Sequence, residues 1–183
     1  IVAARPALMR RVEAEWEAAV RRDLRIVARD DAEYPSMIAA LPDAPVVLYV
    51  KGELPDGRVR LALVGSRRAT AYGRQIAREL AGDLAALGVE IVSGGARGID
   101  TWAHRGALEA GGRTVAVLGC GFAHTYPPEN ADLFRAIAAS GAIVSEFPIE
   151  TSPLAENFPR RNRLISALSA GTIVVEATDK SGS

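Results

Sequence analysis

A glycine-rich segment between an apolar run and a helical pattern is the clearest candidate for chemistry in this sequence. Gly94, Gly95 and Gly98 lie close together with Arg97 between them. Glycine allows positive φ and a close approach of the backbone to a bound group. The helix that follows directs free N–H groups and its positive dipole end to the same place. The segment favours an anion, usually phosphate, although a tight turn that needs glycine only for packing has the same pattern.

A second candidate phosphate loop follows the apolar run 61–64. It consists of Gly65, Ser66, Arg67 and Arg68. The serine hydroxyl and backbone N–H groups are neutral donors, and the guanidinium groups supply charge. The alternative is a solvated arginine pair at a helix start, which is unfavourable because the positive end of a helix repels cations.

Three arginines within four residues form the strongest local charge in the chain. Arg160, Arg161 and Arg163 surround Asn162 and follow Phe158, and we expect them around the first turn of a helix. Mutual repulsion and the helix dipole both oppose this arrangement, so a compensating anion is the natural explanation. Phe158 either stacks a nucleobase or packs in the core. Asn162 either reads a base edge or caps a local turn.

Other reactive side chains carry weaker signals. Asp100 and His104 lie four residues apart on one helix face, as an acid–base pair or as a helix-surface contact. Cys120 lies between glycines without an activating base, which favours a small packed residue. The sequence lacks a complete dinucleotide fingerprint, a Walker-type phosphate loop and a metal-ligand cluster. We therefore expect a phosphodiester-binding protein without a metal or cofactor rather than an enzyme.

Strand and helix signals alternate from about residue 60, which predicts an α/β fold. Nearly continuous apolar runs are typical of a mostly parallel sheet with helices on both faces; they span 61–64, 90–93, 114–118, 142–145 and 172–176. Right-handed crossovers place the loop after each strand at the carboxyl edge. We expect four loops to meet there, namely 65–70, 94–98, 119–126 and 146–160.

The N-terminal third has a different pattern. Helical spacing spans residues 7–22, a short strand is possible at 24–28, and a β-rich run covers 46–50. Turn residues at 55–57 mark a candidate domain seam. We assign residues 1–33 to the remnant of a helical N-terminal module with its linker, and residues 34–183 to a Rossmann-like domain with an incomplete C-terminal end.

Composition limits the possible partners. The 183 residues contain 22 basic and 22 acidic side chains, so any basic surface must be local. One cysteine rules out an internal disulfide framework. No apolar run reaches the length of a membrane span and no signal peptide is visible, so we expect a cytoplasmic protein without membrane contact.

Several motifs together resemble one family. The segments are Gly65-Ser66-Arg67, Ser93 to Asp100 with Ala103-His104, Tyr126-Pro127 with Asn130, Ser145-Glu146, Phe158-Pro159 with Arg161-Asn162-Arg163, and Val175-Glu176-Ala177 with Ser181-Gly182-Ser183. In this order they resemble the DNA-processing protein A (DprA, or Smf) family over residues 34–183. The resemblance implies an extended Rossmann-like domain that binds single-stranded DNA in natural transformation, delivers it to the recombinase RecA and acts as a homodimer.

The resemblance also implies roles for individual residues. Ser66 and Arg67 would hold backbone phosphates, beside the turn from Gly94 to Gly98. The basic pocket would consist of Arg161, Asn162 and Arg163, with Lys180 and Ser181 at its rim. The sequence departs from the family in ending at Ser183, so the winged-helix domain of family members is not represented.

A rival class is the nucleoside-monophosphate phosphoribohydrolases, enzymes of similar layout. They need a Pro-Gly-Gly-x-Gly-Thr loop after the last strand. Residues 178–183 read Thr-Asp-Lys-Ser-Gly-Ser instead.

Overall fold

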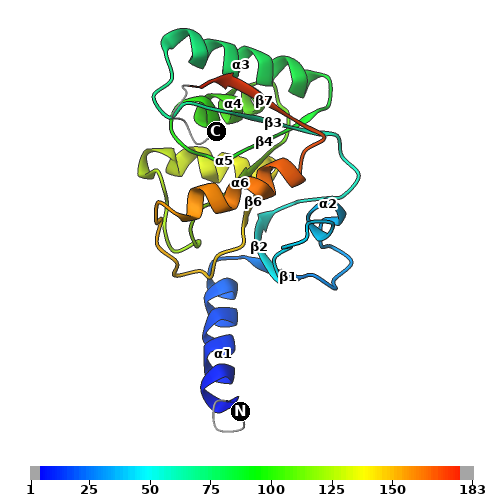
Figure 1. Cartoon of the computed structure of the whole chain (residues 1–183), viewed down its shortest axis with the longest axis vertical. Helices are drawn as coiled ribbons and strands as arrows, with labels where there is room; N and C mark the ends of the chain where they lie inside the picture. Colours follow the sequence, from blue (N-terminus) through cyan, green and yellow to red (C-terminus); the bar gives the residue numbers. More distant parts are fainter. Residues whose placement is uncertain (1–4, 178–183) are drawn as a thin grey trace.

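A single seven-stranded sheet forms the centre of the computed structural model, which describes residues 5–177 (Figure 1). Its order is β1-β2-β6-β5-β4-β3-β7. The strands are β1 (Arg25–Ala28), β2 (Val47–Gly52), β3 (Arg60–Gly65), β4 (Glu90–Ser93), β5 (Thr114–Val117), β6 (Ala142–Ser145) and β7 (Gly171–Glu176). The five strands from β6 to β7 in this order run parallel, whereas β1 and β2 are antiparallel to their neighbours. The predicted α/β fold is confirmed.

Helices cover both faces of the sheet. They are α1 (Arg5–Arg21), α2 (Ser36–Ala39), α3 (Ala71–Ala86), α4 (Ile99–Glu109), α5 (Ala131–Ser140) and α6 (Asn157–Ala167), with a 3-10 turn η2 (Pro128–Asn130) before α5. On one face, α3 and α4 pack on Leu63 and Ile91, and α5 packs on Ala116. On the other face, α2 and α6 pack on Val115 and Val117. Because alternate residues of β5 enter two different cores, the strand must be apolar throughout.

Helices α3 and α4 lie against each other on the face of the sheet that α5 also covers (Figure 1). A side chain at Gly106 of α4 would overlap the backbone of Arg78 on α3, so only glycine permits this approach. The close pair forms a rigid ridge beside β3 and β4. It fixes the outward faces of both helices relative to the carboxyl edge.

The N-terminal strands belong to the same sheet as the rest. β1 pairs with β2, and β2 pairs with β6 at the Tyr49–Ser145 register. The turn at 55–57, predicted as a candidate domain seam, lies between β2 and β3 of this one sheet. The seam stays a prediction. The division into 1–33 and 34–183 stays a prediction. Strand β1, in the first segment, pairs with β2, in the second.

Helix α1 projects from the body as an isolated rod (Figure 1). Its C-terminal end is anchored by buried Ala18 and Ala19 and by Glu15, which accepts a hydrogen bond from the Ile149 N–H (2.7 Å). Trp16 and Val12 are 60% and 53% exposed. None of the helices within residues 5–177 combines the length and apolar character needed to cross a bilayer.

The predicted convergence of loops at the carboxyl edge is confirmed by hydrogen bonds between them. The Ile99 N–H donates to the Ser66 carbonyl (3.1 Å), which joins the loops after β3 and β4. The Asn130 amide donates to the Gly95 carbonyl (3.0 Å). The Gly121 N–H donates to the Thr151 carbonyl (2.8 Å), which joins the loops after β5 and β6.

Candidate nucleic-acid interface

The glycine-rich loop after β4 binds an anion, and that anion is a side chain of the protein itself. The Oδ2 atom of Asp100 accepts hydrogen bonds from the N–H groups of Gly94 (3.1 Å) and Ala96 (3.3 Å). Burial raises the pKa of Asp100, while the charge of Arg161 and these two N–H groups act in the opposite direction. The loop amides that were expected to bind phosphate therefore have an internal partner.

The donor groups at the start of α3 are likewise hydrogen-bonded to a carboxylate of the chain. The carboxylate of Glu176, at the end of β7, accepts hydrogen bonds from the Thr70 N–H (3.1 Å) and the Thr70 hydroxyl (2.5 Å). Thr70 also caps the helix by accepting from the Gly73 N–H (3.0 Å). An internal carboxylate thus lies at each of the two helix starts where we predicted phosphate.

Packing accounts for part of the glycine pattern. Gly98 has φ of +73°, and a side chain there would overlap the Ser66 carbonyl oxygen of the neighbouring loop. A side chain at Gly94 would overlap the Arg161 guanidinium, and one at Gly65 the Glu176 carbonyl. Gly98 lets the loops after β3 and β4 lie in contact, whereas Gly94 and Gly65 leave room for Arg161 and for the end of β7.

The three arginines of α6 point to three different places. The helix starts at Asn157, so Arg160 lies at the end of its first turn and Arg161 and Arg163 follow in the second. Arg161 is 3% exposed and donates to the Gly94 carbonyl (2.9 Å) and to the Val117 carbonyl. Burial lowers the pKa of Arg161 to about 10, which leaves it charged at neutral pH.

The side chains of Arg163 and Arg160 lie on other sides of α6 than the side chain of Arg161. Arg163 forms ion pairs with Asp43 (2.8 Å) and Glu146 (2.5 Å). Arg160 is exposed, with its guanidinium 5.7 Å from the Phe147 ring centroid. The expectation that an external anion compensates Arg161 and Arg163 is wrong, because carbonyl groups and carboxylates of the chain already do so.

Two adjacent aromatic rings with a guanidinium group on each side cross the edge. The Arg67 guanidinium lies 4.7 Å from the Phe158 ring centroid, and the Phe158 and Tyr126 rings are 5.5 Å apart. Arg97 follows at 5.6 Å from the Tyr126 ring. Phe158 is 8% exposed, so it packs under the loop and also supports a cation at the surface.

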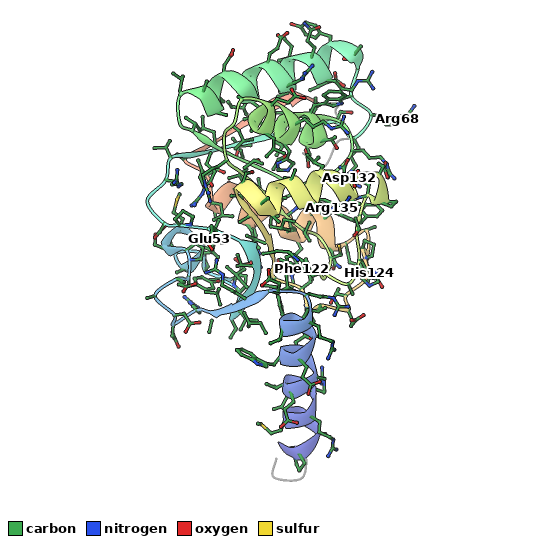
Figure 2. The ribbon with its side chains drawn as sticks, turned by 180° about the vertical axis from the view of Figure 1, so that it is seen from behind. Glu53, Arg68, Phe122, His124, Asp132 and Arg135 are labelled. Atoms are coloured by element: carbon green, nitrogen blue, oxygen red, sulfur yellow. The ribbon has the colours of Figure 1, made fainter. Side chains whose placement is uncertain are left out.

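Two hollows meet at this edge. The first, here called the edge hollow, has a volume of about 970 Å³, and its lining includes Gly65, Ser66, Arg67, Arg68, Phe158, Arg161, Asn162 and Glu176. Asn162 accepts a hydrogen bond from the Arg161 side chain (3.2 Å). Arg67 and Arg68 are the exposed arginines among these residues, and Arg68 points away from the body of the molecule (Figure 2).

The second, here called the arginine hollow, has a volume of about 370 Å³ and shares Arg67 and Arg68 with the first. Its lining includes Arg67, Arg68, Arg74, Arg97, Trp102, Arg105 and Glu129. Glu129 is the one carboxylate among its described lining residues and pairs with Arg97 (3.0 Å). Because both partners are about half exposed, this ion pair adds little stability.

Sequence reasoning missed Arg74, Trp102 and Arg105, which come from the helices and not from the loops. Arg74 lies in the first turn of α3, where the same argument about cations at helix starts applies. Trp102 and Arg105 are three residues apart on α4, and this spacing places them on one face. Lys180 and Ser181, predicted at the rim of the pocket, lie outside the described residues.

The candidate acid–base groups are buried. Asp100 is 6% exposed and His104 is 0% exposed, so neither the acid–base pair nor the surface contact describes them. His104 Nδ1 lies 2.7 Å from the Thr114 hydroxyl, and burial lowers the pKa of His104 to about 3. Burial raises the pKa of Cys120 to about 11, which keeps the thiol protonated at neutral pH.

An α/β domain with clustered arginines at the carboxyl edge is the class of protein that these observations define. A family model described as DNA recombination-mediator protein A matches residues 25–183. The chain belongs to this family. It is 46% identical over 160 residues to Protein Smf of Escherichia coli and 44% identical over 154 residues to DNA processing protein DprA of Bacillus subtilis.

The matches cover 86% and 82% of this chain but only 43% and 52% of those two relatives, so the chain spans about half their length. Two solved structures share the fold. DNA processing protein A of Streptococcus pneumoniae matches with a TM-score of 0.81 at 37% identity, covering 87% of this chain and 56% of that one. The Helicobacter pylori protein, described for its single-stranded DNA binding mode, matches with a TM-score of 0.77 at 34% identity. The match covers 87% of this chain and 72% of that one.

Proposed function

We propose that this chain binds single-stranded DNA at the edge hollow. One observation carries the proposal: Arg67 and Arg68 are exposed side by side at the carboxyl edge, with the Phe158 ring directly beneath Arg67. Arginine recognises phosphate through a planar set of donors. The Phe158 ring supports the Arg67 guanidinium, and an unpaired base can stack on an exposed guanidinium plane.

The proposal extends to the role that family membership suggests. The bound strand would be protected in natural transformation and passed to the recombinase RecA, by a homodimer in the cytoplasm. The names of the relatives, which refer to DNA processing, support this role. The proposal contains no catalytic step or cofactor, and the burial of Asp100, His104 and Cys120 supports that part.

A binding titration tests the main proposal. Fluorescently labelled single-stranded and double-stranded oligonucleotides of one sequence are titrated with the protein, and anisotropy is recorded at two salt concentrations. We expect tighter binding of the single strand and a steep loss of affinity with salt, by about 0.7 in log K per log salt for each phosphate contacted. Equal affinity for both forms would contradict the proposal.

The Arg67→Ala variant tests the site. We expect it to lower the affinity for single strands of any sequence by about five- to tenfold and to reduce the salt slope by about one phosphate equivalent. Arg21→Ala is the matched control, since Arg21 is an exposed arginine on the projecting α1 with an ion-pair partner of its own. An unchanged slope in the Arg67 variant would remove this residue from the interface.

Hydrolysis of nucleoside monophosphates is the competing activity. Asp100 and Glu176 are the carboxylates on which such turnover could depend, and Glu176 is hydrogen-bonded to Thr70. We expect no release of free base when the protein is incubated with nucleoside monophosphates. Release that disappears in the Glu176→Gln variant would favour the enzyme instead.

A further inference from the structure

The arginine hollow adjoins the edge hollow at Arg67 and Arg68. Both residues line both hollows, so a chain that contacts them at the edge is already at the entrance of the second. Beyond them lie Arg74 and Arg105, which are exposed. The proposed function uses neither residue, although a concentration of positive charge in a concave surface attracts a polyanion.

Trp102 gives this second hollow a flat apolar surface. It is half-buried, and the Arg105 guanidinium lies 5.0 Å from its ring centroid. Bases of single strands stack on indole rings and also on guanidinium planes. The Trp102–Arg105 pair therefore provides a layered platform of the kind that binds an unpaired base.

The charge pattern also shows where this surface ends. Trp102 and Arg74 line a third hollow between α3 and α4, of about 830 Å³. Its far part contains Glu79, Asp83 and Glu109. Glu79 and Asp83 repel phosphate and Arg78 is paired with Glu109, so no excess of positive charge continues beyond the tryptophan.

We propose that the arginine hollow is a second subsite for single-stranded DNA, in which a base stacks on Trp102 and Arg105 while Arg74 contacts the phosphate backbone. The proposal rests on the proposed function, since the same strand would occupy the edge hollow first. It extends the interface from the loops onto the outer faces of α3 and α4. Oligonucleotides long enough to reach past Arg68 would occupy both subsites.

Tryptophan fluorescence tests stacking directly. The chain contains two tryptophans, and Trp16 is on α1, so a Trp16→Phe background isolates the signal of Trp102. Poly-dT oligonucleotides of about 4 to 16 nucleotides span the range of known site sizes. We expect quenching of Trp102 only above a threshold length. Binding without quenching at any length would overturn the proposal.

Affinity measurements of variants provide the second test. We expect Trp102→Ala and Arg105→Ala to weaken binding of the longest oligonucleotide by about tenfold, which is about 1.4 kcal/mol, and to leave the shortest unaffected. Trp102→Phe, which retains a flat ring, should recover most of the loss even if the alanine variant folds poorly. Arg135→Ala on α5 is the control, as an exposed arginine paired with Asp132 (Figure 2).

The outcomes separate this proposal from the one it rests on. If Arg67→Ala weakens binding at all lengths while Trp102→Phe, Trp102→Ala and Arg105→Ala match the wild type at all lengths, the second subsite is wrong and the proposed function stands. If Arg67→Ala also has no effect, Arg67 is not part of the interface and the placement of the strand at the edge hollow fails as well. A loss in the Trp102 and Arg105 variants confined to long oligonucleotides supports the second subsite.

Discussion

Individual carboxylates decide which positive groups at the carboxyl edge are available. Asp100 accepts from the loop amides after β4, Glu176 accepts from the start of α3, and Glu146 pairs with Arg163. What remains for a ligand is a set of exposed guanidinium groups led by Arg67 and Arg68. Side chains, and not the backbone amides of glycine turns, therefore define the candidate interface.

Glu129 is a further carboxylate at the surface, where it competes with a ligand for Arg97. Its ion pair with Arg97 lies in the arginine hollow, and both side chains are about half exposed. We expect Glu129→Gln to strengthen binding of single strands about two- to fivefold and to steepen the salt dependence, because it removes a repulsive charge and frees a guanidinium. Anisotropy titrations at two salt concentrations measure both effects. Weaker binding would show that the pair orients Arg97 productively.

The buried imidazole of His104 makes stability depend on pH. Its pKa is about 3 in the folded protein, below the ordinary value of 6.5. As the pH falls below about 6.5, the unfolded state takes up a proton that the folded state does not, so the free energy of unfolding falls by up to about 1.4 kcal/mol per pH unit.

The His104→Asn variant isolates this contribution, since asparagine does not titrate. Urea denaturation at about pH 7 and about pH 5 gives the free energy of unfolding of both proteins. We expect the wild type to lose about 2 kcal/mol more than the variant over this interval. Equal losses would mean that His104 is protonated in the folded state.

At the scale of elements, the contact between the loops after β3 and β4 assembles the edge. Gly98→Ala introduces a side chain at φ of +73° and against the Ser66 carbonyl. Gly57→Ala is a control with nearly the same φ, +76°, and open space around it. We expect Gly57→Ala to cost about 1–2 kcal/mol of unfolding free energy and Gly98→Ala at least about 2 kcal/mol more. Urea denaturation measures both, and equal losses would rule out the loop contact as the cause.

The regular elements were predictable because their signals are local. Apolar runs gave β3 to β7, and helical spacing gave α1, each within one or two residues of the observed bounds. The pairing of β2 with β6 was not predictable, since it joins residues far apart in sequence by backbone hydrogen bonds that leave no side-chain signature.

The candidate site was predictable in its place but not in its contacts. Convergence of loops follows from topology alone, which correctly placed Arg67 and Phe158 at one edge. Whether a given arginine faces solvent depends on rotamers and tertiary partners. Arg161 is next to exposed Arg160 in sequence, yet it is buried against carbonyl groups, and Arg163 is paired with carboxylates.

At the scale of the whole molecule, most of α1 projects away from the body, and only its C-terminal end is anchored. Its contacts with the body begin at Glu15, and the apolar side chains before it are exposed. We expect deletion of residues 1–13 to change the melting temperature by no more than about 2 °C, because exposed side chains contribute little to stability. Thermal unfolding by circular dichroism measures this. A loss of about 10 °C would show that α1 packs on the body in solution.

Carboxylates at the two helix starts have one more consequence. The N–H groups of Gly94, Ala96 and Thr70 already have carboxylate partners. Among the described residues, a lone phosphate group therefore meets mainly solvated guanidinium groups, each of which binds it weakly. Inorganic phosphate and free nucleotides should therefore be poor competitors even at millimolar concentration. A polymer that touches several arginines at once gains from every additional contact without a new association step, so this edge discriminates by the length of its ligand.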